Sequence, residues 1–228
     1  MNLTKKIIFL FALGFCFSAK SQLNFYEKGQ KAFYWGITLA ANGTNFAIDR
    51  MPISSSNDSI LSVYTKSGPG FNLGLIGNWQ INSHFDLRIV PTMMFGEKNI
   101  IYELENGSQV KSNLNTTYLS FPLIVRFKSA PIKDLRVFVL TGIRYDYNII
   151  PQYRPREEPN RITLNQHNFS MEYGVGIQYF FPYFIFSPEI KFQHSLNNVL
   201  GPDQSPLTNS ILRGLYPRGF VLSLNFEG

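Results

Sequence analysis

Hydrophobic and polar residues alternate with a period of two along most of the chain beyond residue 31. In one segment Phe169, Met171 and Tyr173 occupy every second position, with Ser170 and Glu172 between them. This alternation is typical of a β-strand that has one apolar and one polar face. Eight such strands are predicted, at residues 32–42, 70–82, 84–96, 115–127, 135–148, 168–180, 183–196 and 218–227.

The connections between the predicted strands are alternately long and short. Three short ones lie near residues 83, 131 and 182, and four longer ones cover residues 43–68, 97–114, 149–167 and 197–217. Outer-membrane barrels combine short periplasmic turns, longer extracellular loops and an even number of strands. The sequence therefore predicts an all-β fold, an eight-stranded antiparallel transmembrane β-barrel of the outer-membrane type, with both termini in the periplasm. Asn106 and Gly107 predict a hairpin turn above the membrane.

The composition favours a barrel wall that faces lipid. Charged residues make up only 16% of the chain, whereas average globular domains have about 25%. No apolar run beyond residue 21 is long enough for a spanning helix, so a membrane-embedded chain has to form a closed barrel. The apolar rows are expected to face lipid and the polar rows the interior. The alternative is a lipocalin-like barrel or a β-sandwich, in which the apolar rows would fill the interior.

Three prolines lie in the middle of predicted strands, at Pro91, Pro122 and Pro188. Proline has no amide hydrogen to donate to a neighbouring strand, and a closed barrel has no free edge to accommodate it. Bulges or kinks are therefore expected at these three positions.

The first residues have the order of a secretory signal peptide. Lys5 and Lys6 precede an apolar run, and the small residues Ala19 and Ser21 follow it. A membrane anchor is the alternative, but the run is short for a span. A lipoprotein signal would use Cys16, although a bulky phenylalanine precedes that residue. The expected parts are a signal peptide, a short periplasmic segment and a barrel domain, at residues 1–21, 22–31 and 32–228.

Cleavage after residue 21 would change both charge and cysteine content. It removes three lysines, no acidic residue and the only cysteine, so the formal charge falls from +6 to +3. The weak positive charge that remains is no argument for nucleic acid as a partner. Without cysteine there is no disulfide and no cysteine-based zinc site. The expected location is the bacterial outer membrane, after export that depends on the signal peptide.

Charged residues recur on the polar rows of the predicted strands. An eight-stranded barrel is narrow and filled by side chains, so these residues are expected to pair in an interior ion network. A ligand site or polar path is the alternative, and a wide solute channel does not fit. The predicted network consists of Asp86, Arg88, Arg126, Arg136, Arg144, Asp146, Glu172, Glu189 and Lys191.

Histidine and serine are the residues that catalysis would need. His167 and His194 lie near Ser170 and Ser195 at the outer ends of two predicted strands, and His84 lies in a periplasmic turn. A lipid-modifying hydrolase could use such side chains, but neighbouring Ser and His are common by chance. No phosphate loop, GxSxG element or metal-ligand spacing occurs. The prediction is therefore no enzyme, no cofactor and no metal.

Two further segments are candidates for contacts with other molecules. A loop with both charge signs is expected to be solvated or to bind a partner protein or anionic lipid headgroups, through Arg154, Arg156, Glu157 and Glu158. The last strand alternates apolar residues and ends close to an aromatic one, as expected of a signal for the barrel assembly machinery. That predicted assembly signal consists of Phe220, Leu222, Leu224 and Phe226.

Several short stretches resemble one known family. They are residues 68–71 (GPGF), 74–77 (GLIG), 85–88 (FDLR), 118–123 (YLSFPL), 187–191 (SPEIK) and 222–227 (LSLNFE), together with Pro91 and Phe95. From about residue 32 to its end, the chain resembles the PorT-type outer-membrane β-barrel proteins of type IX secretion, which are called SprT in gliding bacteria.

This resemblance implies a non-enzymatic component of the machinery that exports proteins, among them gliding adhesins and secreted hydrolases, across the outer membrane. It implies other type IX secretion subunits as partners and brings no catalytic residues. Residues 48–67 and 151–161 match no motif of that family. A stand-alone barrel that serves as surface adhesin or anchor is the first alternative, and a barrel-type lipid-modifying hydrolase is the second.

Overall fold

The computed structural model describes residues 31–50, 60–104, 109–149, 163–201 and 212–228. The expected signal peptide and nearly all of the segment 22–31 lie outside these residues. Among the described residues, no helix is long and apolar enough to cross a membrane. Their β-strands are β1 Phe33–Arg50, β2 Ile60–Gln80, β3 Phe85–Ile89, β4 Thr92–Leu104, β5 Gln109–Lys128, β6 Leu135–Asn148, β7 His167–Phe180, β8 Ile185–Ser195 and β9 Leu212–Glu227.

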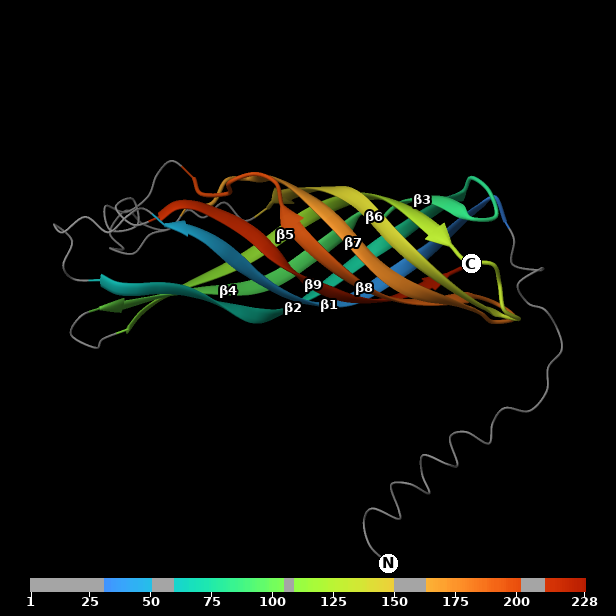
Figure 1. Ribbon diagram of the computed structural model, residues 1–228, viewed down its shortest axis with the longest axis horizontal. Helices are drawn as coiled ribbons and strands as arrows, with labels where there is room; N and C mark the ends of the chain where they lie inside the picture. Colours follow the sequence, from blue (N-terminus) through green and yellow to red (C-terminus); the bar gives the residue numbers. More distant parts are fainter. Residues whose placement is uncertain (1–30, 51–59, 105–108, 150–162, 202–211) are drawn as a thin grey trace, which may run out of the picture.

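The strands form a closed antiparallel barrel (Figure 1). Strand β1 pairs with β2 on one side and with β9 on the other, so the first and last strands close the ring. Strands β3 and β4 follow one another between β2 and β5, and together they occupy one position in the ring. The predicted eight-stranded antiparallel barrel is confirmed, with one of its eight positions divided into two strands.

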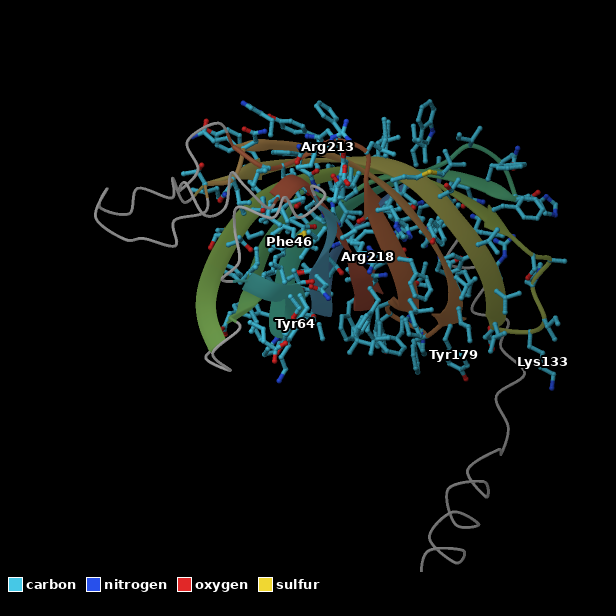
Figure 2. The ribbon with its side chains drawn as sticks, turned by 60° about the vertical axis from the view of Figure 1, so that its left-hand side comes forward. Phe46, Tyr64, Lys133, Tyr179, Arg213 and Arg218 are labelled. Carbon is cyan, nitrogen blue, oxygen red and sulfur yellow. The ribbon has the colours of Figure 1, made fainter. Side chains whose placement is uncertain are left out.

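The two ends of the barrel differ, as the connection lengths predicted. The C-terminus lies at the end that carries the short turns after β2, β5 and β7 (Figure 1). Figure 2 shows Lys133 and Tyr179 toward this end, and Tyr64 and Arg213 toward the opposite end. In an outer-membrane barrel the short turns are periplasmic, which places Tyr64 and Arg213 toward the cell exterior.

Three of the predicted long connections are partly wrong, because strands extend into them, and in the third of these β9 begins at Leu212 rather than at residue 218. Strand β1 extends to Arg50 and β2 begins at Ile60. Strand β4 extends to Leu104 and β5 begins at Gln109, with Glu103 paired to Gln109. The predicted turn at Asn106 and Gly107 itself lies outside the described residues. The alternation of apolar and polar residues weakens above the membrane, so the pattern alone underestimates the strand lengths.

The prolines interrupt pairing without shifting the register. The predicted third strand is wrong as a single strand, because it breaks at Val90 and Pro91. Pro122 lies opposite this break, where its carbonyl oxygen accepts a hydrogen bond of 3.2 Å from the amide of Val90. Beside Pro188 the pairing of β7 with β8 lapses between Gly176 and Tyr179 and then resumes in the same register. The expected bulges do not form, because the missing donors coincide with interruptions of the ladder.

The apolar rows face outward over the middle of the barrel. Leu75 is 61% exposed and Ile143 is 65% exposed, whereas the side chains of Arg126 and Asp86 are 0% exposed. In a barrel or sandwich that folds in water these values would be reversed, because burial of apolar surface drives folding there. The lipocalin-like barrel and the β-sandwich are therefore excluded, and the apolar wall is of the kind that faces lipid acyl chains.

Toward the outer end of the barrel, many of the inward side chains are apolar. The expectation of a polar interior along the whole barrel is wrong there. The structure packs a small hydrophobic core inside the outer end of the barrel. We call it the outer apolar cluster, and it consists of Phe46, Val63, Ile100, Leu164, Val199, Leu212 and Leu215. Water surrounds this end, so ordinary hydrophobic burial can order it.

The outer apolar cluster should contribute to stability even though it lies above the membrane. Ile100 is completely buried within it. Ile100→Val removes one methylene and is expected to lower the free energy of unfolding by roughly 0.5–1.5 kcal/mol. Urea unfolding of the barrel in detergent micelles measures the change. Ile132→Val, in a periplasmic turn where the side chain is 73% exposed, is the control, and equal losses for both variants would contradict a packed outer cluster.

Candidate functional site

The charged residues of the interior form two groups at different heights, which we call the lower and the upper network. In the lower network, Arg126 of β5 donates to Asp86 of β3 at 2.7 Å, and the Nζ of Lys128 lies 2.5 Å from the other carboxylate oxygen. The hydroxyl of Tyr34, from β1, accepts a hydrogen bond from Arg126 at 2.8 Å. The carboxylate of Asp86 thus pairs with two cations, and these contacts join β1, β3 and β5 across the interior.

Arg88 extends the lower network across the barrel. Its guanidinium donates to Glu189 of β8 at 2.9 Å and to Glu227 of β9 at 2.5 Å. Its Nε donates to the side-chain oxygen of Asn78 at 3.1 Å. All of these side chains are at most 3% exposed. Hydrogen bonds between ionised groups are the strong kind, so Arg88 clamps the last strand to the opposite wall of the barrel.

The upper network is centred on Arg144 of β6. Its guanidinium contacts Asp146 at 2.7 Å and Glu172 of β7 at 2.6 Å, and it also donates to Gln193 of β8. Asn168 donates to Asp146 at 2.9 Å. The upper network therefore joins three neighbouring strands, whereas the lower network bridges opposite walls.

The structure places all nine predicted network residues in the interior, but not in one network. Lys191 lies 3.8 Å from Glu189, above the lower network. Arg136 instead donates to the backbone carbonyls of Ser129 and Ser83, close to the periplasmic turns. Desolvation of a charge costs several kcal/mol, and pairing or hydrogen bonding offsets this cost at each of these positions.

Three buried charged residues and one tyrosine of the interior were missing from the predicted network. Lys128 and Glu227 continue the polar rows that contain Arg126 and Asn225, so the period of two could have found both. Tyr34 lies on the polar row of the predicted strand 32–42. Lys98 lies within the predicted connection 97–114, because the pattern does not show the extension of the strand above the membrane.

Side chains fill the interior of the described barrel. Seven cationic and five carboxylate side chains are buried there among the described residues. The cavity beside the upper network has a volume of only about 20 Å³, which is little more than one water molecule needs. A wide path for solutes is therefore absent from the described part of the interior.

Of the histidines of the hydrolase alternative, His84 lies in an exposed turn beside Ser83, at 2.9 Å. His167 and His194 point to the opposite side of the wall from Ser170 and Ser195. His167 and His194 are exposed on the outside, where they hydrogen-bond Tyr145 at 2.7 Å and Tyr173 at 2.9 Å. Ser170 points inward and accepts a hydrogen bond from Asn168. Ser195 donates to the same asparagine. A nucleophile and its base have to be within hydrogen-bond reach, and the pairs of His167 and His194 with these serines are not.

Other predicted sites are placed as follows. The apolar residues of the predicted assembly signal lie on the outward row of β9, which pairs with β1 and β8. The charged loop with Arg154, Arg156, Glu157 and Glu158 lies outside the described residues. Within the described ranges, no three His, Asp or Glu side chains gather closely enough to hold a metal ion.

A closed antiparallel barrel with an apolar outer wall and an interior filled by paired charges defines the class of outer-membrane β-barrels. The outer membrane protein beta-barrel domain family matches residues 20–201, and the chain belongs to this family. Its location is therefore the bacterial outer membrane, with membrane lipid around the apolar wall.

Solved structures of outer-membrane barrels are similar in fold. The outer membrane protein OprG from Pseudomonas aeruginosa matches with a TM-score of 0.50 and 10% identity, over 88% of this chain and 98% of that chain. Neisserial surface protein A matches with a TM-score of 0.47 and 11% identity, over 86% and 96%. The outer membrane enzyme PagL matches with a TM-score of 0.42 and 13% identity, over 83% and 97%. No curated protein sequence matches the chain.

Proposed function

We propose that this outer-membrane barrel is a non-enzymatic component of the type IX protein secretion and gliding-motility machinery, in which it acts as a scaffold or accessory subunit. The observation that carries the proposal is the filled interior. Arg88, Arg126 and Arg144 are buried in ion pairs across the described lumen, so secreted proteins have no path through this barrel. A barrel without a passage contributes to export through its surfaces, by holding other subunits.

The resemblance to PorT-type proteins supplies the choice of machinery. The stretches that carry it are spread over the wall rather than confined to one hairpin. Residues 118–123 lie in β5, residues 187–191 in β8, and residues 222–227 in β9. In this proposal, other type IX secretion subunits are the partners, and the charged loop with Arg154, Arg156, Glu157 and Glu158 is a contact site. The outward row of β9 is read by the barrel assembly machinery.

A stand-alone barrel that serves as surface adhesin or anchor is the second candidate. One observation favours it. Strands β1, β2, β4 and β5 rise above the apolar band, and the outer apolar cluster packs inside them. A packed extension of this kind is a rigid platform for loops that contact another surface.

Deletion of the gene separates the two candidates. We expect the deletion to reduce the secretion of several unrelated proteins at once and to leave them in the periplasm, because they share one export machinery. The measurement is quantitative proteomics of culture medium and periplasm. Re-expression of the chain should restore secretion. Normal secretion together with loss of surface attachment would contradict the type IX role and support the adhesin.

Affinity capture tests the scaffold role directly. A tagged chain, extracted in mild detergent, is expected to retain other secretion subunits. A matched variant reverses the loop charges with Arg154→Glu, Arg156→Glu, Glu157→Lys and Glu158→Lys, which keeps the net charge. Loss of the co-purified subunits, with the same amount of folded barrel, assigns the contact to this loop. If the variant retains the same subunits, the contact lies outside this loop. If the unaltered tagged chain is recovered without any other subunit, the scaffold role is contradicted.

A further inference from the structure

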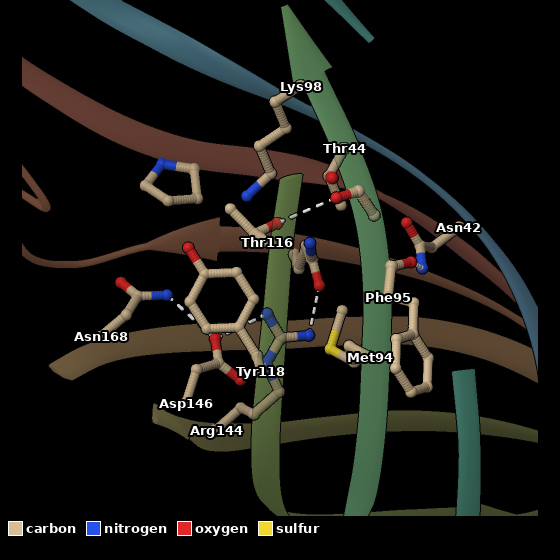
Figure 3. Close-up of a pocket in the computed structure, with 13 residues that line it drawn as sticks. Asn42, Thr44, Met94, Phe95, Lys98, Thr116, Tyr118, Arg144, Asp146 and Asn168 are labelled. Carbon is tan, nitrogen blue, oxygen red and sulfur yellow. Dashed lines mark hydrogen bonds and ion pairs between the residues drawn. The ribbon is translucent and has the colours of Figure 1, made fainter. Parts of the chain in front are cut away.

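A small cavity lies inside the barrel beside the upper network (Figure 3). Lys98 of β4 and Tyr118 of β5 line it from above and from one side, and Arg144 and Asp146 form its base. Lys98 lies three residues beyond Phe95 on β4, and Glu97 occupies the outward position between them. A carboxylate on the outer face marks the aqueous side, so the cavity lies above the apolar band.

Lys98 is a buried cation without a counter-ion in the described part of the chain. Its side chain is only 4% exposed. Its Nζ lies 4.7 Å from the ring centroid of Phe46 and 5.1 Å from that of Tyr118. Such cation–π contacts stabilise a buried cation only modestly, whereas burial of an unpaired charge is strongly unfavourable. The two rings therefore offset only part of the cost.

The one carboxylate at the cavity is already engaged. Asp146 accepts hydrogen bonds from Arg144 at 2.9 Å, from Ser120 at 2.6 Å and from Asn168 at 2.9 Å. The Nε of Arg144 forms a further ion-pair contact with it at 2.7 Å. Lys98 therefore has to compete with these partners for Asp146.

Tyr118 provides a second donor for the same space. It is 8% exposed, and its hydroxyl can donate a hydrogen bond. In Figure 3 the hydroxyl of Tyr118 and the amine of Lys98 both point into the cavity. Two donors, one of them charged, therefore converge on one small space whose lining carboxylate, Asp146, already accepts hydrogen bonds from other residues.

Arg144 is the other cation beside the cavity, and it pairs with both Asp146 and Glu172. Burial lowers the pKa of Lys98 to about 8, with Asp146 opposing this effect and Arg144 adding to it. The ammonium form still predominates at pH 7, and a bound anion would stabilise it further.

We propose that this cavity binds a single halide ion, chloride in the cell, between the Nζ of Lys98 and the hydroxyl of Tyr118. The volume of about 20 Å³ admits one monoatomic ion and excludes phosphate, sulfate and carboxylates. The ion joins β4 to β5 above the membrane and pairs with the ammonium group of Lys98 beneath the outer apolar cluster. It stabilises the outer part of the barrel by mass action, because only the folded barrel holds it.

Bromide is the probe that tests the site. Crystals of the full barrel, soaked in sodium bromide, should give an anomalous difference peak within hydrogen-bond distance of the Nζ of Lys98. The peak should vanish in Lys98→Met and lose occupancy in Tyr118→Phe. Lys66→Met, which changes an exposed lysine of the neighbouring strand β2, is the matched control and should retain the peak. A crystal without this peak, or a peak that persists in Lys98→Met, would overturn the proposal.

A measurement in solution covers the case in which Lys98→Met does not fold. The wild-type barrel should unfold at a higher temperature in sodium bromide or chloride than in sodium gluconate of the same ionic strength, because gluconate is too large for the cavity. The same comparison on Lys66→Met should give the same upward shift. Equal unfolding temperatures in halide and gluconate would mean that the cavity holds water alone.

Discussion

Arg88→Leu is expected to lower the free energy of unfolding by about 3–5 kcal/mol, the usual cost of removing one partner from a buried ion pair. Arg88 neutralises both Glu189 and Glu227, at 2.9 Å and 2.5 Å. Its loss leaves two carboxylates in the interior with only more distant cations. Lys191 lies 3.8 Å and Arg126 4.0 Å from Glu189, and Arg126 lies 3.7 Å from Glu227. Since Glu227 belongs to the last strand, the seam between β9 and β1 should loosen first.

Equilibrium unfolding in lipid vesicles measures this loss, and the heat-dependent mobility of the barrel in gel electrophoresis gives an independent check. Arg213→Leu, at an exposed position of β9, is the matched control and should have little effect. The double variant Arg88→Leu with Glu227→Gln should recover part of the loss, because it removes one of the unpaired charges. Equal stability of the Arg88→Leu and Arg213→Leu variants would contradict a lower network that closes the barrel.

Leu75→Lys is expected to destabilise the barrel by about 2–4 kcal/mol in a bilayer, the cost of a cation on the lipid face near the midplane. Leu75 is 61% exposed and lies on the outward row of β2, midway between Trp79 and Phe71. If the wall faces lipid, the ammonium group has to leave water for hydrocarbon. If the wall faced water, the same change would be harmless.

Tyr183→Lys is the control for this substitution, because Tyr183 lies in a periplasmic turn and is 93% exposed. Unfolding of both variants in vesicles gives the comparison, and a series of vesicles with different acyl-chain lengths locates the midplane. A loss for Tyr183→Lys as large as that for Leu75→Lys would contradict the placement of the apolar band in the membrane.

The wall of the barrel could be predicted from single strands. In β7 the alternation of Phe169 with Ser170 already separates the outer from the inner face, because successive side chains of a strand point to opposite sides. The alternation of short and long connections predicted which end of the barrel faces the periplasm. The break at Pro91 could not be predicted in this way, because it depends on Pro122 lying opposite, and that pairing is set by the register between two strands.

The interior site could be predicted only as a set of residues. The inward rows identify Arg88 and Glu189 as interior, but a row does not say which strand lies across the lumen. Arg88 and Glu227 are 139 positions apart in the chain and meet because the ring closes with a particular register. The cavity at Lys98 could not be predicted for a related reason. Strand β4 continues above the membrane through Lys98, although the alternation of apolar and polar residues is no longer clear there.

The sequence by itself determined that this chain is a barrel with an apolar outer face. The period of two is visible in each strand separately, and strands in lipid can satisfy their backbone hydrogen bonds only in a closed barrel. The tertiary structure alone decided which charges meet, where the prolines are accommodated, and that the interior becomes apolar above the membrane. Those features depend on distances between strands that are remote in the chain, and such distances exist only once the ring has closed.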